Sequence, residues 1–421
     1  MRPVSRTSLT LPLFLVGSVL LLLGGPQFSG KSLFAHAATT DSLHRELQIA
    51  VLLPFNTELI EYDSLNLPVG KVPQASLLAL NYYEGMMMAL DSLRHRGMRI
   101  TVHVYDTYSD TARIQALFEK KEVQKADFIL GPVYGDELRV AASLAKHYKV
   151  PLFSPVVATT SVATDNPYYF VCNASLRTHC RTLYDFILKE YHPAKIFLLY
   201  REGAEQEVNI ARYFSQLEKE MEQVKKTSRQ LIPVSEKTNP GYFQVDSLFN
   251  PDTTADNIVI IPSPDEYFVN TMVKNLKGLS GRFHIVLFGL PKWRYFSSLD
   301  NDDLELLHTC ISSTSWKPRE DSLCERFDSL FQARWTNQSS EFAYAGYDFM
   351  LFAGQQFLHN GKTFYRHLEN YTGAGLANRY RFEPVLNPGT DTSHQRMFDC
   401  YENQQLNILR YENGTLLPVQ H

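Results

Sequence analysis

The sequence predicts an α/β fold with two lobes, each built on a doubly wound parallel sheet. Short apolar runs bounded by Gly or Pro indicate strands buried on both faces, and amphipathic segments of helical spacing separate them. This alternation begins at residue 46 and restarts after residue 175. Because a helix follows nearly every strand, parallel pairing with right-handed crossovers is expected in each lobe.

The first run of the pattern predicts four strands and three helices. Residues 47–53 are nearly all apolar and stop at Pro54, which is typical of a buried strand. The long amphipathic segment that follows ends at Gly97, a favourable residue just beyond a helix. The expected strands are 47–53, 99–105, 127–130 and 150–153, and the expected helices are 77–96, 112–124 and 136–148.

The second run predicts another α/β unit of similar size, followed by a tail of different character. Residues 235–256 are rich in Ser, Thr, Asn, Pro and Asp and predict a loop. The expected strands are 195–200, 231–234, 257–261 and 284–288, and the expected helices are 183–189, 205–224 and 267–276. In the tail we expect helices at 341–358 and 364–370, and strands at 379–382, 403–410 and 416–419. The last two strands flank Glu412-Asn413-Gly414 and are expected at a sheet edge.

The composition is that of an ordinary globular protein. Hydrophobic residues make up 44% of the 421 residues and charged residues 20%, which disfavours disordered, collagen-like and coiled-coil chains. The net charge of −4 lacks the basic excess that nucleic-acid binding needs, so no nucleic-acid partner is expected. The sequence contains no GxSxG or HExxH motif and no Cys/His cluster at metal-ligand spacing. We therefore expect neither an enzyme nor a metal or cofactor.

Residues 1–37 have the pattern of a secretory signal. Arg2 and Arg6 precede an apolar run over 9–23, and Ala35-His36-Ala37 is a small-x-small cleavage pattern. An uncleaved N-terminal anchor is the alternative, although 15 apolar residues are few for a spanning helix, which needs about 20. Removal of Arg2, Arg6 and Lys31 with the signal would change the net charge from −4 to −7. We expect an exported protein of the periplasm or cell envelope, without a transmembrane span in the mature chain.

Export would place the five cysteines in an oxidising compartment, where they can pair. The candidates that are close in sequence are Cys172 with Cys180 and Cys310 with Cys324. Cys400 would then remain alone, and the sequence does not fix the connectivity.

Ligands of open α/β sheets bind beyond the carboxyl ends of the strands, so the loops that follow the strands form the candidate site. Several of these loops carry aromatic or polar residues that could line a ligand pocket. Ordinary loop packing is the alternative for the aromatic residues, and helix capping or a solvated position is the alternative for the carboxylates. The candidate residues are Phe55, Asn56, Tyr108, Tyr134, Gly135, Thr159, Thr160, Tyr200, Glu202, Asp265 and Trp293.

Several stretches of the chain resemble the type I periplasmic binding-protein fold, which includes leucine- and amide-binding proteins and receptor ligand-binding ectodomains. The stretches that carry the resemblance are 49–55, 83–91, 106–107, 129–132, 150–155, 166–168 and 346–348. The resemblance implies two lobes joined by three hinge strands. Lobe I would comprise 46–174 plus 311–388, and lobe II 175–310 plus 389–421.

Residues 287–293 are similar to a form of this fold found in Bacteroidota envelope proteins, often joined to LysM modules, although no LysM-like repeat is visible here. Amino-acid-binding members hold their ligand with one hydroxyl residue shortly after the Gly-Pro turn and another after the Ser-Pro step. Here those positions match Gly135 and Ala158, with Thr159 and Thr160 adjacent to the second. The resemblance thus implies the fold more strongly than amino-acid transport.

Two functions follow as hypotheses. The first is an exported, non-enzymatic protein that closes its lobes on a small molecule or a peptidoglycan-derived fragment. The alternative is an envelope scaffold that activates peptidoglycan synthesis or another envelope enzyme through a protein partner, without a transport ligand.

Overall fold

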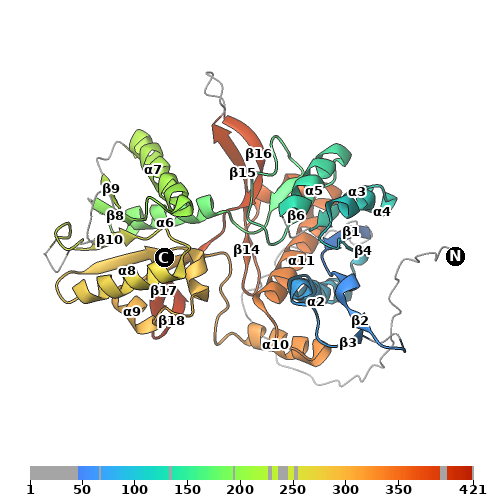
Figure 1. Cartoon of the computed structure of the whole chain (residues 1–421). Helices are drawn as coiled ribbons and strands as arrows, with labels where there is room; N and C mark the ends of the chain where they lie inside the picture. The colour runs from blue at the N-terminus through green and yellow to red at the C-terminus, as the bar shows by residue number, and fades with distance from the viewer. Residues whose placement is uncertain are drawn as a thin grey trace, which may run out of the picture. The chain divides into compact units, whose positions relative to one another are not determined.

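The computed structural model describes residues 46–65, 68–131, 135–192, 195–225, 230–235, 245–250, 255–388 and 396–419. The predicted signal at 1–37 and candidate residue Tyr134 lie outside these ranges. The described chain contains two mixed seven-stranded sheets with flanking helices (Figure 1), which confirms the predicted fold class.

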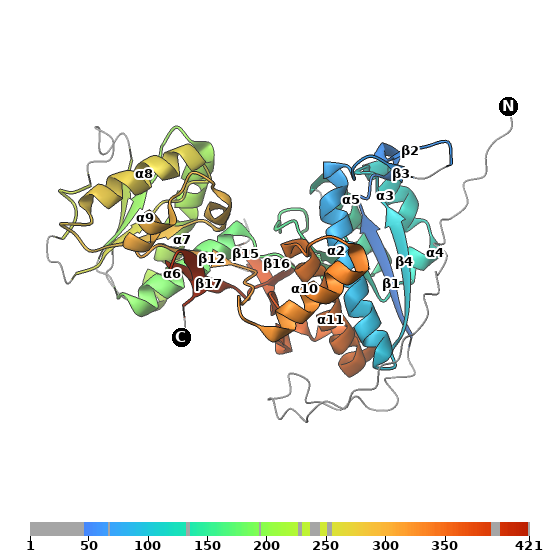
Figure 2. The same ribbon diagram turned by 90° about the horizontal axis from the view of Figure 1, so that it is seen from below.

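The first sheet has the strand order β15-β16-β7-β6-β5-β1-β4, and Figure 2 shows β1 and β4 side by side. All its described neighbours pair in parallel except β15 and β16, which are antiparallel. Its strands are β1 (Glu46–Leu53), β4 (Arg99–Asp106), β5 (Phe128–Leu130), β6 (Leu152–Ser154), β7 (Tyr169–Val171), β15 (Phe382–Pro388) and β16 (Arg396–Asn403).

Alternate side chains of β1 show that this sheet is covered on both faces. Ile49 and Val51 pack into one apolar cluster, whereas Ala50 and Leu52 pack into a second cluster on the opposite face. The helices and short helical segments of this lobe are α2 (Gln74–His95), α3 (Thr111–Phe118), α4 (Lys121–Gln124), α5 (Gly135–Tyr148), α10 (Ser322–Trp335), α11 (Glu341–Asn360) and the 3-10 turns η1 (Thr57–Leu59), η3 (Gly361–Arg366) and η4 (Leu368–Asn370).

The helices α2 and α11 lie against one another on the first of these faces (Figure 1). Glycines allow the close approach at two points. A Cβ atom on Gly85 would lie 1.8 Å from the carbonyl oxygen of Ala343, and one on Gly346 would lie 2.1 Å from that of Tyr82. Larger residues at either position would push the two helices apart.

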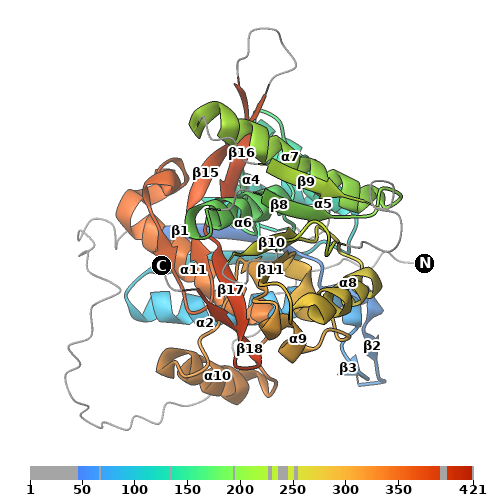
Figure 3. The same ribbon diagram turned by 90° about the vertical axis from the view of Figure 1, so that its left-hand side faces the viewer.

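The second sheet has the order β18-β17-β12-β11-β10-β8-β9, with parallel pairing from β12 to β9 and antiparallel pairing of β17 with both neighbours. Figure 3 shows β17 and β18 together. Its strands are β8 (Lys195–Leu199), β9 (Gln230–Val234), β10 (Asn257–Ile260), β11 (Ile285–Gly289), β12 (Cys310–Ser313), β17 (Asn407–Glu412) and β18 (Thr415–Pro418). The helices are α6 (Leu176–Glu190), α7 (Glu205–Lys225), α8 (Glu266–Leu279), α9 (Asn301–Leu306) and the 3-10 turn η2 (Pro291–Tyr295).

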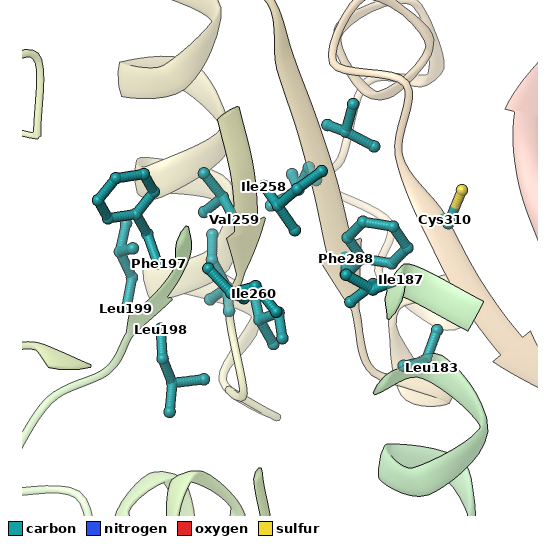
Figure 4. Close-up of a cluster of buried hydrophobic side chains, with 14 of the residues drawn as sticks. Leu183, Ile187, Phe197, Leu198, Leu199, Ile258, Val259, Ile260, Phe288 and Cys310 are labelled. Carbon is teal, nitrogen blue, oxygen red and sulfur yellow. The ribbon is translucent and has the colours of Figure 1, made fainter. Parts of the chain in front are cut away.

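A single large apolar cluster holds this second lobe together. Figure 4 shows part of it, where Leu183 and Ile187 of α6 lie beside Phe288 of β11. The strands on either side of Asn413-Gly414 pair as a hairpin, and both residues have positive φ angles, of 53° and 68°. β18 lies at the sheet edge, but β17 is an interior strand between β12 and β18.

Within the described residues the chain crosses between the two sheets three times, and two crossings differ from the predicted boundaries. β12 belongs entirely to the second sheet, so the second crossing lies after residue 313 and not at 310/311. β16 pairs in parallel with β7, at Tyr401 opposite Phe170, and therefore belongs to the first sheet. The third crossing thus lies between residues 403 and 407, where 388/389 was predicted. The two remaining small sheets are β2 (Glu61–Tyr62) with β3 (Pro68–Val69), and β13 (Gly373–Ala374) with β14 (Arg379–Tyr380).

The disulfides predicted from proximity in sequence are not formed. All five cysteines are free and buried. Cys172 lies in the core of the first lobe and Cys180 in that of the second, and Cys310 and Cys324 likewise belong to different clusters. In each pair the chain crosses from one sheet to the other between the two cysteines, so a short sequence separation does not bring the thiols together.

Candidate functional site

The candidate residues that the structure describes lie beyond the carboxyl ends of strands, at one end of each sheet. At the first sheet, Asp106 at the end of β4 organises this end. Its carboxylate accepts hydrogen bonds from the backbone N–H groups of Asn56, Thr57 and Tyr108 at 3.0, 2.8 and 3.0 Å, and from the Thr57 hydroxyl at 2.8 Å. Asp106 therefore connects the loop after β1 to the loop after β4. The N-cap of α3 is a different residue, Asp110, whose side chain accepts a hydrogen bond from Ala112 N–H.

Three of the candidates take part in these two loops. Asn56 is buried, has a φ of 49° and accepts a hydrogen bond from the Ser109 hydroxyl at 3.1 Å. Phe55 is half-buried and packs edge-on against Tyr83, with ring centroids 5.6 Å apart. Tyr108 is half-buried beneath the Arg113 guanidinium, which lies 5.4 Å from its ring centroid. Phe55 and Tyr108 keep a surface that a ligand could contact, whereas Asn56 is occupied within the loop.

The loop after β6 carries Thr159 and Thr160, both half-buried. The Thr159 hydroxyl lies 2.9 Å from the Ser161 hydroxyl, and the Thr159 carbonyl accepts from the Tyr169 hydroxyl at 2.8 Å. The Thr160 carbonyl accepts from Ala163 N–H at 3.3 Å. The loop is thus fixed by its own hydrogen bonds, and both threonine side chains remain partly accessible.

Between the starts of α3 and α5 lies an open depression of about 690 Å³, which we call the acidic hollow. Its lining residues come from the starts of α3 and α5 and are Ser109, Asp110, Thr111, Gly135, Asp136 and Glu137. The candidate Gly135 is exposed, and a Cβ atom there would meet no other atom within 4 Å.

Glu137 is the unusual member of the hollow because its side chain is buried without a hydrogen-bond partner. The hydroxyl of Thr107 is likewise buried and lies close to the Glu137 carboxylate, but it has no partner at normal hydrogen-bond distance and angle. Burial raises the pKa of Glu137, the Thr107 hydroxyl opposes that shift, and the carboxylates of Asp110 and Asp106 raise the pKa further. Its position in the first turn of a predicted helix gave no sign of this burial, since acidic residues are common there for their interaction with the helix dipole.

At the second sheet, a charged network built on Glu207 forms the corresponding end. Glu207 is 1% exposed and accepts from Arg201 N–H at 2.7 Å, from Arg201 Nε at 3.0 Å, from Arg201 Nη2 and from the Ser263 hydroxyl at 2.7 Å. The guanidinium also pairs with Asp265 at 3.3 Å and lies 4.3 Å from the ring centroid of Phe268. The list of candidate residues includes neither Arg201 nor Glu207. Glu207 lies in the helix that follows the loop, and the sequence pattern does not predict that its side chain turns back toward Arg201.

The electrostatics of this network favour the ionised groups. Hydrogen bonding to Glu207 raises the pKa of Arg201. The backbone N–H of Phe268 lowers the pKa of Asp265, and Arg201 lowers it further. Asp265 is the N-cap of α8, which agrees with the helix-capping alternative given for the carboxylates. The residue is also exposed, so a ligand could still contact it.

The remaining second-lobe candidates divide into two kinds. Tyr200 and Glu202 are half-buried in the loop after β8, and Glu202 accepts a hydrogen bond from the Ser235 hydroxyl. Trp293 is 1% exposed and donates its indole N–H to the Ser263 carbonyl at 2.9 Å. A Cβ atom on Gly289 would lie 2.2 Å from the Trp293 ring, so the ring packs directly on the end of β11. The expectation that Trp293 lines a pocket is wrong, because its ring is part of the core.

In the ranges that the structure describes, no group of three or more His, Cys, Asp or Glu side chains could hold a metal ion. A search of the same residues found no helix with the length and apolarity that a membrane span requires.

Comparisons with known proteins place the fold. Residues 73–222 match the family described as periplasmic binding protein. A comparison with curated protein sequences found no match.

Solved structures match over most of the chain at low identity. A putative branched-chain amino acid ABC transporter protein from Rhodospirillum rubrum is 12% identical, with a TM-score of 0.59, covering 89% of this chain and 100% of that one. A periplasmic ligand-binding protein of a branched-chain amino acid ABC transporter from Burkholderia xenovorans is 11% identical, with a TM-score of 0.55, covering 89% and 94%. An ABC transporter substrate-binding protein from Desulfitobacterium hafniense, solved with leucine, is 14% identical, with a TM-score of 0.52, covering 89% and 100%.

Proposed function

The chain has the fold of the type I periplasmic binding proteins, and we propose that it is an exported, non-enzymatic protein that closes its two lobes on a small molecule or a cell-wall fragment. The observation that carries this proposal is the organisation of the strand ends in both lobes. In each lobe, a carboxylate that accepts several hydrogen bonds, Asp106 or Glu207, fixes the loops that follow the strands. Loops held in this way present polar and aromatic groups at defined positions, which ligand binding needs.

The candidate residues that keep accessible surface are the proposed ligand contacts. They are Phe55, Tyr108, Gly135, Thr159 and Thr160 in the first lobe, and Tyr200, Glu202 and Asp265 in the second. Lobe closure about the crossing strands would bring ligand contacts from both lobes onto one molecule. Periplasm is the proposed location, supported by the signal pattern in residues 1–37 and by the family match.

The proposed ligand is not a free branched-chain amino acid. Gly135 and Ala158 lack the hydroxyl groups that the resemblance implies for holding an amino-acid ligand. A desolvated charge without partners costs several kcal/mol, so leucine would bind poorly at this end of the sheet.

A thermal-shift screen of the mature protein tests the proposal. We expect a concentration-dependent rise in melting temperature with at least one member of amino-acid, peptide, sugar and muropeptide libraries, because a ligand that binds the folded state stabilises it. Small-angle X-ray scattering with that ligand should show a smaller radius of gyration. A substitution of Asp265 to Asn should weaken the response, whereas Asp302 to Asn, an exposed carboxylate in α9, should not. Absence of any shift across the libraries would contradict the proposal.

One observation favours the envelope scaffold as a second candidate function. The charged groups at this end of the second sheet largely satisfy one another, since Arg201 is engaged by Glu207 and Asp265. A scaffold needs no free ligand-binding groups there. Recovery of a peptidoglycan synthase from envelope extract, together with a negative ligand screen, would support that function.

A further inference from the structure

The acidic hollow holds a carboxylate that the fold itself does not use. Glu137 is 2% exposed, and neither of its oxygens has a partner at normal hydrogen-bond distance and angle, although the Thr107 hydroxyl is close enough to lower the pKa of the carboxyl. Thr107, which is fully buried, also has an unpartnered hydroxyl oxygen. Buried polar groups are nearly always hydrogen-bonded, and a buried carboxylate without a partner is costly. A group of this kind at a surface depression indicates a partner that comes from outside the chain.

The other carboxylates around the hollow differ from Glu137 because the fold uses them. Asp106 accepts from three backbone N–H groups and one hydroxyl, and Asp110 caps α3. Asp136 is exposed to solvent. Only Glu137, within the described lining of the hollow, combines burial with unfilled acceptor capacity.

The negative charge of the hollow favours a cationic ligand group over an anionic one. Its described lining includes Asp110, Asp136 and Glu137 and no Lys or Arg. The nearby Arg113 is directed elsewhere, since its guanidinium lies over the Tyr108 ring and its Nε donates to the Asp106 carbonyl at 3.3 Å. A ligand carboxylate or phosphate would meet like charge here, whereas a cation would be attracted.

We propose that the acidic hollow binds a protonated amine of the ligand, with the Glu137 carboxylate as its acceptor. This inference rests on the proposed ligand-binding function and specifies the ligand class of the first lobe. An ammonium group supplies three donors, and the two oxygens of Glu137 are acceptors that the fold leaves unfilled. A metal ion fits less well, because the described residues contain no cluster of three metal-ligating side chains.

A matched pair of probes separates amine recognition from sugar recognition. Glucosamine carries a protonated amine and N-acetylglucosamine does not, while the sugar ring is the same. Putrescine provides an amine without a ring, and leucine provides an amine next to a carboxylate. Calorimetry with the mature protein should show that glucosamine or putrescine binds at least about tenfold more tightly than N-acetylglucosamine and leucine. N-acetylglucosamine lacks the charge-assisted hydrogen bond of the amine. Leucine brings a carboxylate close to the carboxylates of the hollow.

Two variants then locate the interaction. Glu137→Gln keeps the shape of the side chain and should weaken amine binding by about tenfold or more. Asp302→Asn removes one exposed charge from α9, outside the hollow, and should change the affinity less than about threefold. Melting curves without ligand establish that both variants fold.

Each outcome decides the inference. Equal losses in the two variants would mean nonspecific electrostatic attraction and would overturn it. Binding of a neutral or anionic library ligand, with no amine binding, would overturn it and leave the proposed function intact. Binding of no ligand at all would overturn both.

Discussion

Replacement of Glu207 by Ala should destabilise the second lobe and loosen the loop after β8. The side chain is 1% exposed and accepts four hydrogen bonds, three of them from Arg201. Removal of one partner from a fully buried ion pair costs about 3–5 kcal/mol. Arg201 retains 27% exposure and can still pair with Asp265, so water and that carboxylate recover part of the loss. We expect a decrease of about 2–3 kcal/mol in the free energy of unfolding, at or below the lower limit of the range for a fully buried pair, because solvent screens part of the loss.

Glu207→Gln separates charge from shape. One oxygen of Glu207 accepts from Arg201 Nε, Arg201 Nη2 and Ser263, and the other accepts from Arg201 N–H. An amide offers one acceptor oxygen and would turn an NH₂ group toward one of these donors. The expected loss is about 1–2 kcal/mol, between the wild type and the Ala variant.

Hydrogen exchange provides the local assay, since two lobes need not unfold in one step. Peptides covering 200–207 should exchange faster in both variants, and urea unfolding followed by tryptophan fluorescence should give the global cost. Glu205→Ala is the matched control, because Glu205 is exposed and lies in the first turn of the same helix. A Glu207→Ala variant that costs no more than Glu205→Ala would refute the reasoning.

Four further outcomes are expected. Asp348→Ala should lower the unfolding free energy by about 3–5 kcal/mol in urea denaturation, because this buried carboxylate accepts four hydrogen bonds from residues 376–378, and a loss under about 1 kcal/mol would contradict that role. Gly131→Ala should lower the melting temperature, since the φ angle of 103° and a Cβ only 1.9 Å from the Leu52 carbonyl oxygen strain any side chain, and an unchanged melting temperature would contradict this. Because burial raises the pKa of Glu137, its carboxylate destabilises the folded state increasingly as pH rises through that pKa. Without ligand, Glu137→Gln should therefore have a higher melting temperature than the wild type at pH 7 and the same melting temperature near pH 4. A constant difference from pH 4 to 7 would refute this. A thiol reagent should titrate five cysteines in urea and almost none in the folded protein, whereas three or fewer in urea would indicate disulfides.

The sequence was most informative where burial is continuous along a strand. Residues 47–53 predicted β1 because a strand covered on both faces is apolar at nearly every position. The strand β7, with three residues, is too short to show a period, and β12 has the mixed sequence Cys-Ile-Ser-Ser. The unpredicted helix α10 did carry a signal, since Asp321 caps it and Cys324, Phe327 and Phe331 follow at helical spacing.

The site was less predictable than the fold, because side-chain direction depends on contacts between segments distant in sequence. The strand-end rule selected Tyr108 and Asp265, which keep accessible surface, but it also selected Trp293, whose ring turns inward to the Ser263 carbonyl. Glu137 and Glu207 both lie in the first turn of a helix. Acidic residues there are ordinary by sequence, so their burial appears only when the neighbouring loops are in place.

The late return of the chain to the second sheet has a consequence for synthesis. β17 and β18 are the last strands along the described part of the chain, yet β17 pairs with β12 in the interior of that sheet. Until residue 412 has emerged, the outer hydrogen-bonding groups of β12 remain an open strand edge with buried residues such as Ile311 behind it. A chain that stalls or is cleaved before β17 would therefore expose an unpaired strand edge, and residues 407–418 protect the nascent protein from pairing with its neighbours through that edge.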